Sequence, residues 1–199
     1  MASAPALLER VSALEARLGV VEASAQDAQD RLDVLNLVAA SAYLLDAHSF
    51  QKRGEQFVPG GVFELIPKET FPEVADWPQT SAQDVESMVP GKEGEEWYEE
   101  MRVAGKRGLT HFPSIVHVTV YGDRAVAIQH IAVLERDPTA EPLHVPPHGI
   151  IRGFRTLMVS VNHFECVRTP AGWRIARRNL RVNTGVEARR LLGEWAAEA

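Results

Sequence analysis

Apolar residues recur at alternating spacings of four and three residues along positions 7–42. The positions that share this spacing are Leu7, Val11, Leu14, Leu18, Val21, Ala25, Ala28, Leu32, Leu35, Ala39 and Ala42. A heptad repeat of this length is typical of a packed helix or a coiled coil. Gly19 and the polar residues at 24–30 interrupt it, so the pattern predicts two helices or one helix with a weak centre. Two uses of the repeat stay open: packing against the protein's own body and self-association.

The second half of the chain has the period of two that is typical of β-strands. Strands are predicted at residues 114–121, 125–134, 150–167 and 173–182, and a terminal helix at 185–198. Gly122-Asp123 and residues 169–172 have the composition of hairpin turns. Residues 136–149 contain four prolines and are predicted to form a loop. Gly153 marks a candidate bulge in the strand that follows.

Short elements separate these two regions. Pro59-Gly60-Gly61 predicts a chain break after a short helix at 50–57. The remaining elements are predicted as a β-rich run at 62–66, a loop at 67–80 and helices at 81–88 and 93–105. Helices and antiparallel strands are thus largely segregated, which indicates an α+β fold: a cone-shaped, curved antiparallel sheet wrapped by helices, with an N-terminal heptad helix. We expect a helical extension at residues 1–27 and one domain at 28–199.

Bulk properties narrow the function classes. The 199 residues are 45% hydrophobic and carry a net charge of -6. No basic stripe is present, so nucleic acid is not an expected partner. No apolar run approaches the roughly 18 residues of a membrane span, and Glu9 and Arg10 interrupt the first apolar stretch, so neither a membrane partner nor a signal peptide is predicted. The single cysteine, Cys166, excludes a disulfide within the chain and fits a cytoplasmic location.

Motifs for phosphate, metal or cofactor binding are missing from the sequence, so no metal and no cofactor is predicted. Two residues have a local context that suggests chemistry. Asp46 ends a mostly apolar helix, where the helix macrodipole disfavours a carboxylate unless another group compensates. His111 stands at the start of the strand region, where a histidine is either a satisfied structural residue or a base.

Four segments together resemble the SnoaL-like group of the nuclear transport factor 2 superfamily. They are the helix end at residues 45–50, the element at 110–112, the hairpin at 120–125 and the ending at 172–179. The resemblance covers roughly residues 31–183 and implies the cone-shaped fold. Within the group the chain is most similar to three lyases: scytalone dehydratase, bile acid 7α-dehydratase and hexachlorocyclohexane dehydrochlorinase.

The resemblance assigns roles to individual residues. Asp46 and His111 fall where these lyases have a pocket Asp–His pair, and Arg178 matches an assisting arginine on the last strand. Ser160 and Asn162 resemble the Ser-x-Asn that lines the pocket of scytalone dehydratase. The chain departs from the pattern five residues before Asp46, because it has Ser41 where relatives have a tyrosine or a lysine.

General chemistry gives these residues a mechanism. Asp46 would orient His111 and stabilise its imidazolium while the histidine takes a proton from carbon. Arg178 would stabilise negative charge that develops on a leaving group or enolate. Strict strand alternation places Arg178 on the face opposite Trp173 and Ile175, so all three share a face only if a bulge intervenes.

Several other residues are candidates for substrate contact. Ser160 and Asn162 would face the same side of a strand and could hydrogen-bond a substrate oxygen; the alternative is a polar outer face. The candidate walls of the pocket are Tyr43, Phe63, Trp77, Trp97, Tyr98 and Met158. For each of these the alternative is ordinary core packing.

The function predicted first is a cofactor-free lyase, a dehydratase or similar elimination enzyme, that acts on a hydrophobic small molecule. Two alternatives stay open: a polyketide cyclase or isomerase of the same fold, and a non-catalytic ligand-binding module. Relatives of this fold commonly form dimers or trimers, so a homo-oligomer is expected.

Overall fold

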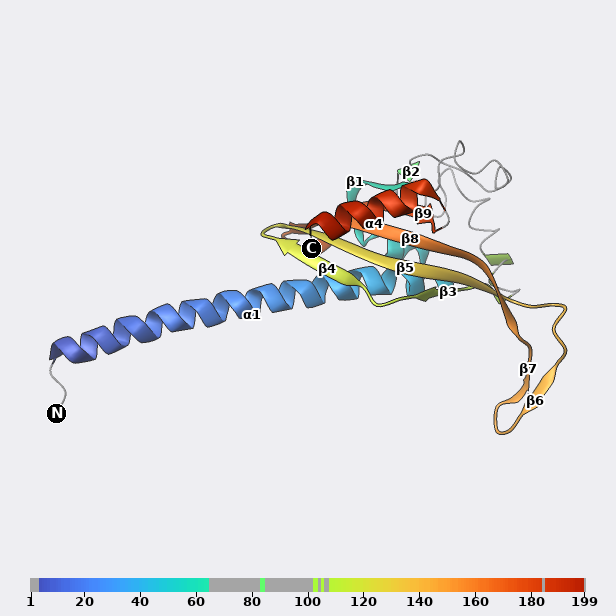
Figure 1. The fold of residues 1–199 in the computed structure, drawn as a ribbon, viewed down its shortest axis with the longest axis horizontal. Helices are drawn as coiled ribbons and strands as arrows, with labels where there is room; N and C mark the ends of the chain where they lie inside the picture. The colour runs from blue at the N-terminus through green and yellow to red at the C-terminus, as the bar shows by residue number, and fades with distance from the viewer. Residues whose placement is uncertain are drawn as a thin grey trace.

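A computed structural model describes residues 4–64, 83–84, 102–103, 105, 108–183 and 185–198 (Figure 1). The helices are α1 (Ala4–Asp46), α2 (Phe50–Gly54) and α4 (Val186–Glu198). The strands are β1 (Phe57–Glu64), β2 (Gln83–Asp84), β3 (Thr110–Pro113), β4 (His117–Tyr121), β5 (Arg124–Arg136), β6 (Leu143–Val145), β7 (Gly149–Ile151), β8 (Phe154–Thr169) and β9 (Gly172–Val182).

One curved sheet forms the body of the protein. Its strand order is β2-β1-β9-β8-β5-β3, and β4 also pairs with β5. The pairs are antiparallel except that β1 runs parallel to β9. The predicted α+β class with a curved sheet and a long N-terminal helix is confirmed, and the parallel β1–β9 pair is an addition to it.

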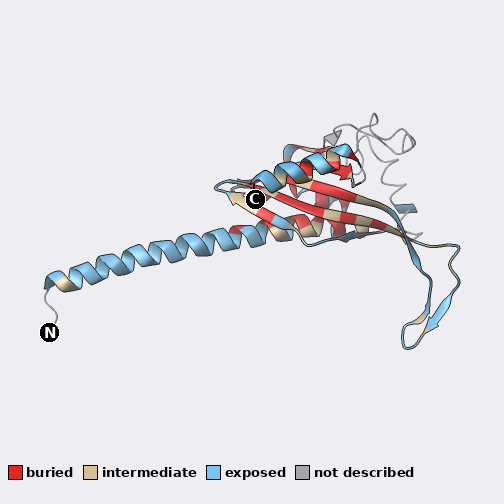
Figure 2. Ribbon diagram, in the orientation of Figure 1, coloured by how far each residue is buried: buried red, intermediate tan, exposed pale blue. Residues whose placement is uncertain are grey.

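The two faces of the sheet are covered by different helices. Directly paired residues of neighbouring strands point to the same side, and the inner face, defined here as the face that packs on α1, holds the main core. That core contains Val34, Val38 and Leu45 of α1 together with Ala127, Phe164, Cys166, Trp173, Ile175 and Leu180 of the sheet. On the outer face, Ile128 and Val161 pack on Ala188 and Leu191 of α4. Figure 2 shows the buried residues concentrated in the sheet and the adjoining part of α1.

A bulge in β9 decides which residues face inward. Glu165 pairs with Arg177 and Cys166 pairs with Ile175, so one residue of β9 is left between the two pairs. The extra residue reverses the alternation from that point. Trp173, Ile175 and Arg178 are therefore all buried on the inner face, which is the arrangement that strict alternation forbids.

The N-terminal heptads form a single helix without a break, which selects one of the two predicted alternatives. Residues 4–29 of α1 have no buried side chain, and the first buried residue is Asp30. Figure 1 shows this part of α1 extending away from the sheet as an arm. Among the described residues, no helix has the length and apolar character needed to cross a membrane.

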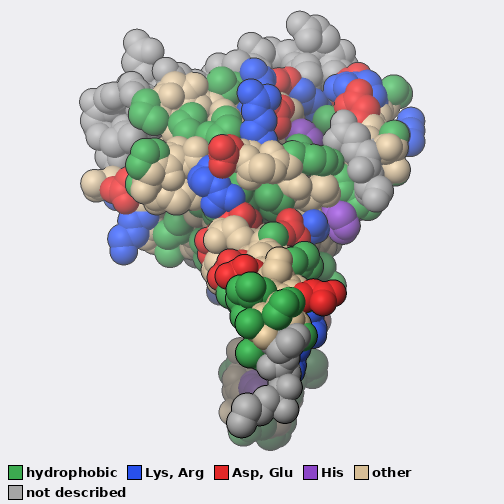
Figure 3. Space-filling model, turned by 90° about the vertical axis from the view of Figure 1, so that its left-hand side faces the viewer, with side chains coloured by type: hydrophobic (Ala, Val, Ile, Leu, Met, Phe, Trp, Pro, Cys, Tyr) green, Lys and Arg blue, Asp and Glu red, His purple; other side chains and the backbone are tan. Residues whose placement is uncertain are grey.

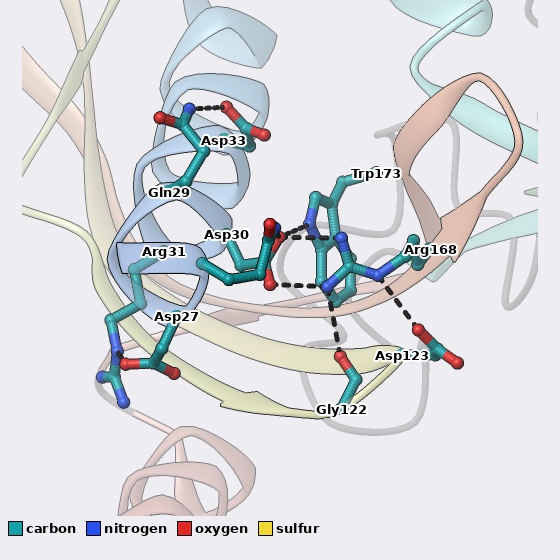
Figure 4. A network of polar contacts seen from close by, with 10 residues as sticks. Asp27, Gln29, Asp30, Arg31, Asp33, Gly122, Asp123, Arg168 and Trp173 are labelled. Carbon is teal, nitrogen blue, oxygen red and sulfur yellow. Dashed lines mark hydrogen bonds and ion pairs between the residues drawn. The ribbon is translucent and has the colours of Figure 1, made fainter. Parts of the chain in front are cut away.

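A partly buried ion pair fixes α1 where it meets the body (Figure 4). The Arg168 guanidinium donates hydrogen bonds to both carboxylate oxygens of Asp30, one of them at 2.7 Å. The Trp173 indole N–H donates to the same carboxylate at 3.2 Å, and Arg168 also donates to Asp123 at 3.0 Å. We call Asp30, Arg168 and Trp173 the clasp, because they join α1 to the end of β8 and the start of β9.

Some predicted elements were wrong. β1 begins at Phe57 and passes through Pro59-Gly60-Gly61, with a shift of register against β9 instead of a chain break. The proline-rich segment at 136–149 contains β6 and part of β7, which pair as a hairpin. Gln83 and Asp84 form β2, although a helix was predicted at 81–88. Trp77, Trp97 and Tyr98 lie outside the described residues.

Candidate functional site

The end of α1 and the start of β3 bring Asp46 and His111 together. His111 Nδ1 lies 2.6 Å from Asp46 Oδ1. The backbone N–H of His111 donates to Asp46 Oδ2 at 2.9 Å, and the Thr110 hydroxyl donates to the same oxygen at 2.6 Å. These three contacts compensate a carboxylate that the macrodipole of α1 disfavours at this end. The local signal at Asp46 in the sequence therefore has a physical explanation.

The hydrogen bonds also set the ionisation of Asp46. Partial burial raises the pKa of Asp46, but the hydrogen bonds from His111 and Thr110 outweigh it and hold the pKa below its ordinary value. Asp46 is therefore a carboxylate at neutral pH. A neutral His111 then donates from Nδ1, which leaves the lone pair on Nε2. This is the arrangement of a histidine base that is oriented by a carboxylate.

The register of the sheet places His111 on the inner face. His111 pairs with Val133 of β5, and Val133 pairs with Met158 of β8. Pro113, Ile131 and Ser160 form the next inward-facing row. Met158 is partly buried and packs on the core. The Asp–His pair thus lies at the β3 end of the inner face, beside the main core.

Arg178 forms a second polar group on the same face. Its Nε and Nη2 donate to Asn162 Oδ1 at 3.0 and 2.7 Å. The Asn162 amide in turn donates to Ser160 Oγ at 2.9 Å, and Arg178 Nη1 donates a long hydrogen bond of 3.5 Å to Ser41 Oγ. All four residues are buried. Ser41, which stands where relatives have a tyrosine or a lysine, therefore contacts Arg178.

The charge of Arg178 is not balanced by a carboxylate within the described part of the chain. Its hydrogen bonds there go to the neutral oxygens of Asn162 and Ser41, and its guanidinium lies over the rings of Phe63 and Phe164 at 4.6 and 5.2 Å. Burial, with the nearby positive charge of Arg53, lowers the pKa of Arg178 well below its ordinary value. A guanidinium is so strong a base that it stays charged near neutrality, so the site holds a costly buried cation.

α1 covers both polar groups. Ser41 and Asp46 are five residues apart on this helix, or about 7.5 Å along its axis. On β5, Val133 is in the row of His111 and Gln129 is in the row of Asn162. These rows are four residues apart, or roughly 13 Å along an extended strand. The Asp–His pair and Arg178 thus lie on the same face of the sheet, and the row of Arg178 itself, with Phe164 and Ala127, is six residues from that of Val133, or roughly 20 Å along the strand.

The structure places the remaining predicted site residues differently. Phe63 is buried beneath Arg178, and Ser160 and Asn162 are fully buried on the inner face instead of forming a polar outer face. Tyr43 is 66% exposed and does not join this cluster, because it lies on a flank of α1 that packs on nothing described. Arg53 stacks on Phe63 at 5.3 Å; the sequence carried no signal for it, and Thr110 was recognisable only as the neighbour of His111.

Metal ligands do not cluster in the described ranges: no three His, Cys, Asp or Glu side chains gather there. Cys166 is buried, and burial raises the pKa of its thiol to about 12, which suits a packing role. The chemistry available at this site is therefore that of a histidine base, a carboxylate and a buried cation.

Comparison with known families identifies the family of this chain. A family model described as a SnoaL-like domain matches residues 26–179. The chain belongs to the SnoaL-like family. The match of this SnoaL-like protein begins within the arm of α1 and ends on β9, so it includes Asp46, His111 and Arg178. No protein of curated function matches its sequence at a significant level.

Solved structures share the fold. An NTF2-like protein with a cystatin-like fold from Novosphingobium aromaticivorans is 25% identical, with a TM-score of 0.63 over 90% of the SnoaL-like chain and 94% of its own. A proposed scytalone dehydratase from the same organism is 16% identical, with a TM-score of 0.51 over 75% and 81%. A protein from Catenulispora acidiphila in complex with S-DNPA is 15% identical, with a TM-score of 0.50 over 77% and 92%. The last two likenesses concern the fold alone.

Proposed function

We propose that this SnoaL-like protein is a cofactor-free lyase that eliminates water or a similar group from a hydrophobic small molecule. The observation that carries the proposal is the contact of 2.6 Å between His111 Nδ1 and Asp46, made while Thr110 and a backbone N–H hold the same carboxylate. A carboxylate fixed in this way orients the imidazole before substrate arrives. Such preorganisation is what a general base on carbon needs.

In the proposed elimination, His111 Nε2 takes a proton from a carbon atom next to an electron-withdrawing group. The electron pair of the broken C–H bond forms a C=C bond as the group on the neighbouring carbon leaves. The imidazolium that results is stabilised by the negative charge of Asp46. His111 then returns its proton to a departing hydroxyl, which leaves as water.

Arg178 would stabilise the negative charge that develops on the substrate oxygen or on the leaving group. A cation that is already buried and oriented costs no reorganisation when this charge appears. Asn162 has its oxygen on Arg178 and its amide N–H on Ser160. We therefore assign Asn162 to positioning the guanidinium.

The same pair of residues can also serve an isomerase or a cyclase. In those reactions the proton returns to the substrate, or a ring closes, and no group is lost. The buried Arg178 would stabilise an enolate in either case, so it does not separate these functions. The product does separate them.

The test is a screen of hydrophobic β-hydroxy ketones, phenolic alcohols and alkyl halides in D₂O. Ultraviolet absorbance detects a new conjugated double bond, and mass spectrometry detects either the loss of a group or deuterium uptake without loss. We expect loss of a group, and we expect His111→Gln and Asp46→Asn to lower kcat/KM by about 10²–10⁴-fold.

The matched control is His144→Gln, because His144 is an exposed histidine on the β6–β7 hairpin. It should leave kcat/KM unchanged. Turnover that survives His111→Gln would contradict the proposal. Deuterium uptake without loss of a group would identify an isomerase instead.

A further inference from the structure

The arm of α1 presents apolar side chains that nothing in the described structure covers. Over residues 4–29 the large apolar side chains are half exposed or more: Leu7, Leu8, Val11, Leu14, Leu18, Val20 and Val21. The arm is about 39 Å long at 1.5 Å per residue. Isolated helices are marginally stable in water and gain most of their stability by packing an apolar face. The arm therefore needs a surface to pack on.

The heptad register defines that surface. With Val11, Leu18, Ala25 and Leu32 at position a, the residues Leu7, Leu14, Val21 and Ala28 occupy position d. Where the arm meets the body, α1 packs on the sheet through a different face, formed by Asp30, Val34 and Val38 at positions f, c and g; only further along the helix is a d residue, Ala42, buried as well. Leu32 accordingly stays 53% exposed beside the buried Asp30 and Val34. The a/d stripe runs along four heptads on a side that the body leaves open.

The charged residues that flank the stripe favour a second copy of the same helix as the partner, in the parallel orientation. Arg10 and Arg17 occupy position g, and Glu15 and Glu22 occupy position e. In a parallel coiled coil, a residue at g faces the e residue of the next heptad on the other helix. A second copy would therefore place its two glutamates opposite Arg10 and Arg17. An antiparallel pairing would instead set arginine against arginine and glutamate against glutamate.

We propose that residues 4–32 form a parallel two-stranded coiled coil with the same segment of a second copy of this chain. Val11 at position a with leucine at the neighbouring d positions favours two strands. Gly19 falls at position b, on the outer side, where it does not interrupt the seam. Figure 3 looks along the arm from its N-terminal end and shows hydrophobic and charged side chains together on its surface. The clasp at Asp30 fixes the arm to the body, so the two domains would lie at the same end of the rod.

Sedimentation equilibrium of the full chain tests the contact. The wild type should have the mass of two chains, and L14E/L18E should raise the dimer dissociation constant by at least about 100-fold, because it sets two glutamates against their copies at the seam. Val20 and Val21 give a matched comparison, since they are adjacent and 70% and 62% exposed. Val21→Glu at position d should weaken the dimer, whereas Val20→Glu at position c should leave it intact.

Direction is tested by Leu7→Cys. Two copies in a parallel coiled coil bring the residue 7 side chains together, so mild oxidation should give a covalent dimer. Cys166 does not compete, because it is buried. The charge pairs are tested by R10E/R17E, which should weaken the dimer, and by R10E/E15R/R17E/E22R, which should restore it.

Circular dichroism on every variant confirms that the body is folded. A monomeric wild type, an L14E/L18E variant with undiminished self-association, or Leu7→Cys chains that fail to cross-link would each overturn the proposal. A mass of three chains would overturn the two-stranded arrangement.

Discussion

Two arginines of this protein are alike in their stacking but opposite in their charge balance. Arg168 lies over Trp173 and Arg178 lies over Phe63, each with the guanidinium carbon 4.6 Å from the ring centroid. Arg168 donates to the carboxylates of Asp30 and Asp123. Arg178 is more deeply buried, yet its hydrogen bonds go to neutral oxygens of the described residues.

The difference shows in the direction of the pKa shifts. The hydrogen bonds to Asp30 raise the pKa of Arg168 and, in return, lower the pKa of Asp30 to about 2. Burial lowers the pKa of Arg178 instead. The balanced pair joins α1 to the sheet and contributes stability. The unbalanced cation is maintained at a cost in stability, which is typical of a residue kept for a ligand or a transition state.

The largest expected effect is the loss of stability in Arg168→Met. The substitution leaves the buried Asp30 carboxylate without its cation, and a buried charge that has lost its partner is strongly destabilising. Urea unfolding followed by circular dichroism measures it. A free energy of unfolding equal to that of the wild type would show that the clasp contributes nothing.

Arg178→Met should separate activity from stability. Removing a preorganised charge from a transition state costs about 10²–10³ in kcat, and it should do so here. The free energy of unfolding should stay the same or increase, because a buried cation without a carboxylate is replaced by an apolar side chain. The comparison fails if Arg178→Met destabilises the fold as much as Arg168→Met.

Lowering the pH should remove the contribution of the clasp to the free energy of unfolding over a defined pH interval. The pKa of Asp30 is about 2 in the folded chain and 3.8 ordinarily, so the unfolded chain binds the proton first. The ion pair therefore stabilises the fold above about pH 4, and this contribution, about 2 kcal/mol, is lost as the pH falls towards 2. Asp30→Asn should show a flatter dependence of unfolding free energy on pH over that interval. An unchanged slope would mean that Asp30 does not titrate with folding.

The smallest expected effect is that of Ser41→Ala. Its hydrogen bond to Arg178 is long at 3.5 Å, and both bonds to Asn162 remain. We expect a loss of less than about 1 kcal/mol in stability and a change of less than about fivefold in kcat/KM. A loss as large as that of Arg178→Met would assign Ser41 to the reaction itself.

Elements that depend on a local pattern of residues could be predicted from the sequence, whereas features that depend on how strands pair could not. The heptads of α1 and the Gly122-Asp123 turn are visible because periodicity and turn chemistry are local properties. The bulge in β9 is not, because nothing between Trp173 and Arg178 has the glycine that marks many bulges. The register with β8 creates it. Likewise β1 continues beyond Pro59-Gly60-Gly61 because β9 pairs with it on both sides of that segment, at Phe57 and from Val62 onward.

The site was partly predictable for the same reason. Asp46 gave a local signal, a carboxylate at the unfavourable end of a helix, and the family pattern supplied His111 and Arg178. Thr110 gave none, since its contact is with Asp46, which is far away in the chain, and Arg53 gave none, since its contact with Phe63 depends on how β1 turns back after α2. Nor does the sequence say that the side-chain oxygen of Asn162 accepts hydrogen bonds from Arg178.

In the proposed mechanism, Arg178 keeps a positive charge for an anion that the described chain does not supply. Calorimetric binding of matched aromatic carboxylates and amides, such as 2-naphthoate and 2-naphthamide, tests it directly because the two ligands share a shape and differ in charge. We expect the wild type to bind the carboxylate at least about tenfold more tightly and Arg178→Met to lose this preference. Equal affinity of the wild type for both ligands would contradict it.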